Sequence, residues 1–220
     1  MNRHEFSLAM FAAMLLAAST ESRAATILTS PAEFSTPTVL ISFEQFPNGE
    51  QVPIGPTDLV DQWRPWGMVL EDSSPFNGAR VFTNTFDVLP HSPIRAIADS
   101  EGDTAGGFII FSFVIPGTST PGTVQEAGLW VQNGDVSPST VSFFDVQGGV
   151  LQTLTTSLSD QFIGIRATEG IASIRVSDDG FDMVDDLQFT PVPEPWATEM
   201  SLMALALQAH LGRRRRHPTS

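Results

Sequence analysis

Residues 107–115 have the sequence GFIIFSFVI, in which most side chains are β-branched or aromatic and only Ser112 is polar. Side chains of these types favour extended strands. A run that is apolar on both of its faces is typical of a central strand that is covered on both sides. The stretch therefore predicts a buried central β-strand.

Shorter runs of the same kind lie on either side of this stretch, separated by Gly, Pro, Asn and Asp. In 171–177 (IASIRVS) apolar and polar side chains alternate, as expected for a strand with one buried face. About eleven strands at spacings of roughly 8–14 residues predict an all-β antiparallel sandwich of the jelly-roll kind. We expect strands at 38–44, 67–71, 79–83, 94–98, 107–115, 123–132, 140–146, 150–155, 162–167, 171–177 and 183–190, and a single helical turn at 57–63.

Charge is distributed unevenly along the chain. Of the 220 residues, 25 are acidic and 11 are basic, for a net charge of −14. Residues 1–24 are neutral overall, residues 25–190 carry 21 acidic residues against five Arg, and residues 191–220 have a net charge of +2. The acidic body argues against general nucleic-acid binding, which depends on Lys and Arg at phosphates. The absence of Cys excludes disulfides, thiolate metal sites and Cys nucleophiles.

The N-terminal segment has the layout of an export signal. Arg3 precedes an apolar run at 8–18 (LAMFAAMLLAA), which is shorter than the roughly 20 residues of a membrane-spanning helix. Small residues at Ser22 and Ala24 suit a cleavage site. We therefore predict a signal peptide with an N-terminal helix at 1–24, export through the Sec machinery, and a β-sandwich domain at 25–190. A buried amphipathic helix is the alternative for this segment.

The C-terminal segment, 191–220, combines three features in order. Pro193-Glu194-Pro195 follows the last expected strand, an apolar run occupies 197–211, and Arg213-Arg214-Arg215-Arg216 lies near the chain end. Proline cannot continue a sheet ladder, so the domain is expected to end here. An arginine cluster after an apolar helix stays on the cytoplasmic side of a membrane.

This tail resembles the PEP-CTERM sorting signal. The resemblance implies that Pro193, Glu194 and Pro195 form the motif recognised by an exosortase, and that Arg213 to Arg216 retain the chain end while the apolar helix anchors the precursor in the inner membrane. It further implies release to the cell surface or extracellular matrix of a bacterium with an outer membrane, in association with exopolysaccharide or biofilm. The apolar run is short and contains Glu199, so a helix on the membrane surface or packed against the domain is the alternative.

The body contains no recognisable catalytic motif, and we assign no catalytic residue. Its only histidine, His91, lies between prolines in Pro90-His91-Ser92-Pro93 and is interpreted as a loop residue. The protein is therefore expected to be non-enzymatic. Glycoside hydrolysis needs two carboxylates across a cleft, and an unrecognised pair of this kind is one alternative.

The two ends of the domain provide a candidate metal site. The body broadly resembles β-sandwich carbohydrate-binding modules, many of which hold a structural Ca²⁺ between an early Glu and a late Asp. That resemblance implies a calcium site at Glu44 and Asp185 or Asp186, with carboxylates as the hard oxygen ligands that Ca²⁺ prefers. Solvated acidic residues in turns are the alternative.

Aromatic side chains provide a candidate sugar-binding surface. Trp63 and Trp66 lie in DQWRPW and could stack on sugar rings if they are exposed, whereas core packing is the alternative. Trp130 is flanked by Leu129 and Val131, which favours the core at least as much. A carbohydrate-binding module or lectin-like adhesin, stabilised by calcium, is therefore the leading alternative to a purely structural matrix protein.

Overall fold

The computed structural model describes residues 25–72, 79–83, 90–98, 107–133, 138–156, 160–177 and 182–192. The predicted signal peptide and signal helix, the sorting motif, the apolar helix and the arginine cluster therefore lie outside the described residues. Within the described part, no helix is long and apolar enough to cross a membrane.

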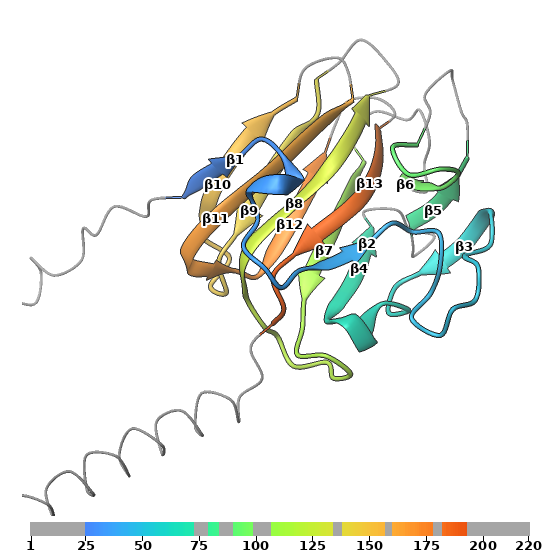
Figure 1. Ribbon diagram of the computed structural model, residues 1–220, viewed down its shortest axis with the longest axis horizontal. Coiled ribbons are helices and arrows are strands. Elements are labelled where there is room, and N and C mark those ends of the chain that lie inside the picture. Colours follow the sequence, from blue (N-terminus) through green and yellow to red (C-terminus); the bar gives the residue numbers. More distant parts are fainter. Residues whose placement is uncertain are drawn as a thin grey trace, which may run out of the picture.

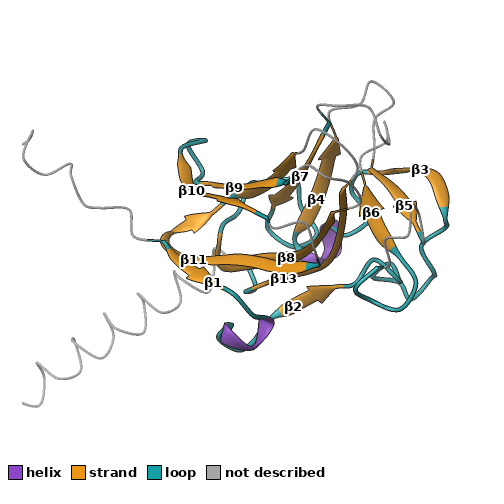
Figure 2. Cartoon of the chain, turned by 90° about the horizontal axis from the view of Figure 1, so that it is seen from above, coloured by secondary structure: helices purple, strands orange, loops and turns teal. Residues whose placement is uncertain are grey.

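The described residues form two antiparallel sheets that stack face to face (Figures 1 and 2). One sheet has eight strands, seven of them in a continuous order, and β2 pairs with β13 beside this path. In spatial order these strands are β1 (Thr26–Leu28), β11 (Gln161–Ile171), β8 (Val124–Asn133), β13 (Asp182–Phe189), β6 (Ala96–Ala98), β5 (Ala79–Phe82) and β3 (Gly55–Leu59), with β2 (Val39–Ile41).

The other sheet has five strands. In spatial order they are β10 (Val150–Thr155), β9 (Thr140–Phe144), β12 (Ser173–Ser177), β7 (Phe108–Phe113) and β4 (Met68–Asp72). Two short 3-10 helices, η1 (Pro31–Glu33) and η2 (Arg64–Trp66), lie in the connections. The expected all-β antiparallel sandwich is confirmed.

The core lies between the sheets and is built by the period-2 alternation of the strands. In β12, Ile174 and Val176 are buried while the intervening residues are only partly buried. The same inward-facing pattern fixes the register of β7 and β9 on either side of β12. A one-residue slip would expose every one of these apolar side chains, so the pattern specifies the pairing.

Two expectations about the fold are wrong. The predicted helical turn at 57–63 is divided between β3, which includes residues 57–59, and a connection to η2. β7 lies next to the edge strand β4, and its outward-facing Phe108 and Ile110 are only partly buried, so it is not covered on both sides. Its outer apolar residues instead contribute to a surface described below.

Candidate functional site

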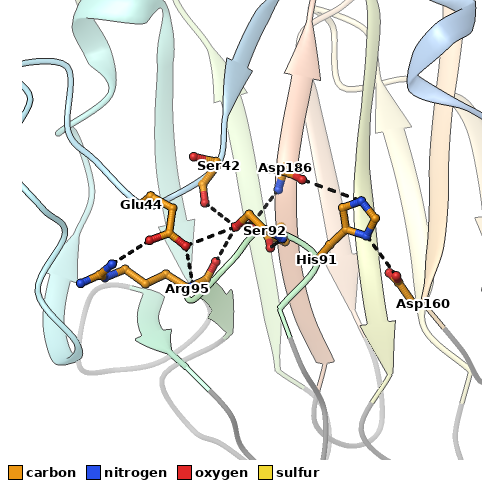
Figure 3. Close-up of polar contacts among 8 residues, drawn as sticks. Ser42, Glu44, His91, Ser92, Arg95, Asp160 and Asp186 are labelled. Atoms are coloured by element: carbon orange, nitrogen blue, oxygen red, sulfur yellow. Dashed lines mark hydrogen bonds and ion pairs between the residues drawn. The ribbon is translucent and has the colours of Figure 1, made fainter.

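Four segments that are far apart in the sequence meet on the outer side of the eight-stranded sheet (Figure 3). Glu44 follows β2, residues 91–95 precede β6, Asp160 precedes β11, and Asp185-Asp186 lie within β13. The pairing of β2 with β13, in which Ile41 lies opposite Leu187, brings the first and last of these segments together.

An irregularity in β13 positions its two carboxylates. The register against β8 shifts between Asp185 and Gln188, and Asp186 has a φ of 46°. Asp is among the residues that tolerate this left-handed conformation, and a bulge of this kind re-aims side chains. Val184 and Leu187 can therefore both face the core, although they are three residues apart, while Asp185 points to the outer side.

Glu44 is held by Arg95. Glu44 Oε2 accepts a hydrogen bond from Arg95 Nη1 at 2.7 Å, and Oε1 accepts from the backbone N–H groups of Ile94 and Arg95, both at 2.8 Å. The side chains of Arg95 and Glu44 are only 9% and 19% exposed. Burial raises the pKa of Glu44, but these hydrogen bonds outweigh it, so the pKa lies below its ordinary value.

Asp185 is held by Ser92. The Ser92 N–H donates to Asp185 Oδ2 at 2.6 Å, and the Ser92 hydroxyl lies 2.9 Å from Oδ1, which also accepts from the Asp186 N–H at 2.8 Å. Asp185 has no exposed surface. Burial raises its pKa to about 7 against the opposing effect of the Ser92 hydrogen bonds. Asp185 therefore organises the loop at 91–95 and cannot reach a ligand in solution.

His91 lies above Trp130 and between two carboxylates. The two rings are stacked, with centroids 3.6 Å apart and planes 11° from parallel. His91 Nδ1 is 3.0 Å from Asp160 Oδ2, and Nε2 is 4.0 Å from Asp186 Oδ2 (Figure 3). The His91 side chain remains 32% exposed. Burial raises the pKa of Asp186, as do the charges of Glu44 and Asp160, whereas His91 opposes the rise.

Trp130 faces outward and is supported from the sheet. Phe162 lies opposite it on β11, with ring centroids 5.8 Å apart and an edge-on geometry. Gly128 on β8 leaves room for the Phe162 ring on the neighbouring strand β11, because a Cβ on Gly128 would lie 2.6 Å from that ring. We call His91, Trp130, Asp160 and Asp186 the His91 platform. It combines a supported aromatic surface with two partly exposed carboxylates.

The two tryptophans predicted to bind sugar lie elsewhere. Trp63 is fully buried, packs edge-on against Phe43 with centroids 5.3 Å apart, and donates from Nε1 to the Gln45 carbonyl at 3.3 Å. The prediction is wrong for Trp63, because a ring without exposed surface cannot stack on a sugar. Trp66 is half-buried in η2 and packs against the same core, and its role in binding stays a prediction.

The three predicted calcium ligands are neighbours, but the carboxylate oxygens of Glu44 and Asp185 are already engaged in hydrogen bonds. Both Glu44 oxygens accept from N–H groups, one of them on the cationic Arg95, and both Asp185 oxygens accept from Ser92. Among the described residues, no group of three or more His and acidic side chains is arranged to hold a metal. Ca²⁺ takes six to eight oxygen ligands, so it would have to displace some of these contacts to bind here. Calcium binding here would require Arg95 to leave Glu44, and it stays a prediction.

A second polar network lies beside a groove at the start of β8. The Glu126 carboxylate accepts from Arg166 Nε, and it accepts from the Ser35 N–H and hydroxyl at 2.8 and 2.7 Å. Burial raises the pKa of Glu126, but these hydrogen bonds lower it below its ordinary value. The groove has a volume of about 580 Å³ and is lined by Ser35, Thr36, Pro37, Gln125, Glu126, Arg166, Thr190 and Pro191. Its charged groups are paired with each other, so we assign it a structural role.

The fold and the His91 platform define a class: an all-β antiparallel sandwich with an aromatic and acidic surface on one sheet.

No family model matches the sequence, and no curated protein matches it. Among solved structures, it is similar to TmCBM61 in complex with β-1,4-galactotriose, with 14% identity, coverage of 61% of this chain and 95% of that one, and a TM-score of 0.39. It is also similar to the CBM22-1 xylan-binding domain from Paenibacillus barcinonensis Xyn10C, with 13% identity, coverage of 71% and 94%, and a TM-score of 0.35. A third is the family 11 carbohydrate-binding module of Lic26A-Cel5E from Clostridium thermocellum, with 14% identity, coverage of 64% and 98%, and a TM-score of 0.29.

Trp130, Ser92 and Arg95 were not assigned to the site from the sequence, although the sequence contains a pattern that indicates the outward orientation of Trp130. The alternation of Leu129, Trp130 and Val131 places the tryptophan on the face opposite its two core neighbours, which would have identified it as outward-facing. Ser92 and Arg95 lie in an irregular, proline-flanked segment with no periodicity, and only the tertiary structure shows their partners.

Proposed function

We propose that the protein is a non-catalytic carbohydrate-binding module and that the His91 platform is its binding surface. The observation that carries this proposal is the stacked His91–Trp130 pair with Asp160 and Asp186 beside the imidazole. An aromatic surface packs against the apolar face of a sugar ring, and carboxylates accept hydrogen bonds from its hydroxyl groups. A few fixed polar groups around an apolar surface are the usual composition of a small-molecule site.

Binding fits the arrangement better than hydrolysis. A hydrolytic pair needs one carboxyl group with a raised pKa that can reach the glycosidic oxygen. Asp185, whose pKa is raised to about 7, has no exposed surface, and Glu44 is fixed by Arg95. Burial also raises the pKa of Asp186, but the imidazole of His91, 4.0 Å from its Oδ2, opposes this rise. The partly exposed carboxylates, Asp160 and Asp186, both lie beside the same imidazole, where they are suited to hold a ligand.

Calorimetric titration with a panel of neutral β-linked oligosaccharides tests this proposal. For a ligand that binds, we expect His91→Ala and Asp160→Asn each to weaken binding by about tenfold or more, equivalent to about 1.4 kcal/mol. Asp61→Asn is the matched control. Asp61 is an exposed carboxylate outside the His91 platform, and its Oδ2 lies 2.7 Å from Arg64 Nη2. Unchanged binding in His91→Ala and Asp160→Asn would exclude the platform, and failure of the whole panel would exclude neutral-glycan binding.

We also propose that the module is exported and sorted by its C-terminal segment. The support is the sequence order of Pro193-Glu194-Pro195, apolar run and Arg213–Arg216, together with the N-terminal export signal. Exosortase processing would then deliver the module to the cell surface or matrix, where extracellular polysaccharide is available. Replacing the four arginines with Gln and fractionating cells tests the retention role. Loss of the membrane-bound precursor is expected, and unchanged processing and location would contradict it.

A further inference from the structure

The outer face of the five-stranded sheet carries an arginine surrounded by hydroxyl groups. Arg175 lies in the middle of β12, opposite Ser142 on β9 and opposite Ile110 on β7. Register therefore places eight side chains around it on the same face. They are Thr140, Ser142 and Phe144 on β9, Ser173 and Ser177 on β12, and Phe108, Ile110 and Ser112 on β7. We call these nine residues the Arg175 face.

The guanidinium of Arg175 has no polar partner in the described part of the chain. Its central carbon lies 4.0 Å from the centroid of the Phe108 ring, which fixes the group against the sheet. Its Nε is buried and makes no hydrogen bond. Arg64 and Arg95 also have a buried Nε without a partner, but each forms an ion pair through a terminal nitrogen. Arg175 is only partly buried, so the terminal nitrogens of its guanidinium remain open to a partner from outside the described chain.

The local charge on this face is positive although the body is acidic. All eight neighbours of Arg175 are uncharged. Among the described residues, the acidic side chain of this face that register places nearest is Glu71 on β4, which lies opposite Ile110 and is therefore two strands from Arg175. Two strand spacings amount to about 10 Å, which is comparable to the screening length at physiological salt. An anionic group at Arg175 would therefore experience mainly the guanidinium.

We propose that the Arg175 face binds the carboxylate of an acidic saccharide, such as a uronate unit in a polysaccharide. Guanidinium groups bind carboxylates through two parallel N–H···O bonds, and a guanidinium stacked on a ring is already oriented for this. The five surrounding hydroxyl side chains can exchange hydrogen bonds with sugar hydroxyls, and Phe108 and Phe144 offer apolar contacts. This site is on the opposite side of the sandwich from the His91 platform and does not depend on it.

Titration of the full chain with oligogalacturonate, and with a neutral galacto-oligosaccharide of equal length, tests this inference. Oligogalacturonate is expected to bind the unmodified chain at least tenfold more tightly than the neutral oligomer. Arg175→Gln is expected to remove this preference, and Arg175→Lys, which keeps the charge but loses the planar fork, is expected to have an intermediate affinity. Arg80→Gln is the matched control, because Arg80 lies on β5 of the other sheet.

The outcomes distinguish this site from the His91 platform. His91→Ala should leave oligogalacturonate binding unchanged, whereas Arg175→Gln should leave neutral-glycan binding at the platform unchanged. A denaturation curve of Arg175→Gln that matches the unmodified chain excludes unfolding as the cause of lost binding. Absence of oligogalacturonate binding to the unmodified chain, equal binding by Arg175→Gln, or equal loss in Arg80→Gln would each overturn the inference.

Discussion

On the outer side of the eight-stranded sheet, Arg95 and Arg166 are each paired with a carboxylate that is largely buried, and the loop at 91–95 is fastened to β13 through Ser92. On the outer side of the five-stranded sheet, Arg175 lies on Phe108, and no carboxylate among the described residues pairs with it. Residues of the same type therefore differ in what they contribute. The paired arginines stabilise the fold, whereas Arg175 is available to a ligand.

The largest effect is expected at Arg95. Arg95→Met removes the cation from Glu44 and leaves a largely buried carboxylate with fewer donors. Hydrogen bonds to charged groups contribute about 1.5–3 kcal/mol, so we expect a loss of that size in the free energy of unfolding. Urea denaturation measures it. If Arg175→Met lost as much stability as Arg95→Met, the two faces would not differ as described.

Glu126→Gln is expected to lower the free energy of unfolding by about 1–3 kcal/mol, because it gives Ser35 and Arg166 an amide in place of a carboxylate. Because the folded-state pKa of Glu126 lies below its ordinary value of 4.5, the unfolded state binds the proton more readily as the pH falls. Its contribution is therefore present above pH 4.5 and is lost at lower pH. Unfolding measured at pH 7 and pH 3 should show a smaller cost of the substitution at pH 3, and an equal cost would contradict the pairing.

Asp185→Asn is expected to lower the free energy of unfolding by about 1 kcal/mol. The dependence of this loss on pH should be opposite to that of Glu126→Gln. The pKa of Asp185 is about 7 in the folded protein and 3.8 ordinarily, so between these values the folded state binds the proton more readily. Burial of Asp185 therefore makes the unmodified protein less stable as the pH rises through this range. The asparagine variant lacks this penalty, so its deficit should shrink from pH 4 to pH 8. A deficit that grows with pH would show that Asp185 is not held in a desolvated site.

The smallest effect on stability is expected for Arg175→Gln. Because Arg175 forms no ion pair with the described residues and lies on the surface of the sheet, its replacement should change the free energy of unfolding by no more than about 0.5 kcal/mol. Thermal or urea denaturation measures this. A loss above about 1.5 kcal/mol would indicate a structural role for Arg175 instead.

The fold could be predicted from the sequence wherever a strand buries one face. The alternation in β12 and β8 is a direct consequence of core packing, so it is visible in the residues. β3 was missed because Gly55–Leu59 contains proline and aspartate and is specified by irregular pairing with β5 rather than by its own residues. A strand of this kind has no periodicity to detect.

The site could be predicted only in part. The proximity of Glu44 and Asp185 follows from the pairing of an early strand with the last strand, and the resemblance to β-sandwich modules implied it. Their actual partners, Arg95 and Ser92, lie in a loop whose path is set by tertiary contacts. For Trp63 the sequence leaves both sugar stacking and core packing open, because no local pattern shows that its ring packs on Phe43.

The most direct test of binding at the His91 platform uses the indole N–H signals. The chain has four tryptophans, and each contributes one indole N–H resonance to a ¹H–¹⁵N spectrum. During titration with a neutral oligosaccharide that binds, the Trp130 signal should shift in proportion to saturation. The signal of Trp63, which has no exposed surface, should stay in place. Saturable binding that leaves the Trp130 signal unmoved would contradict the central claim.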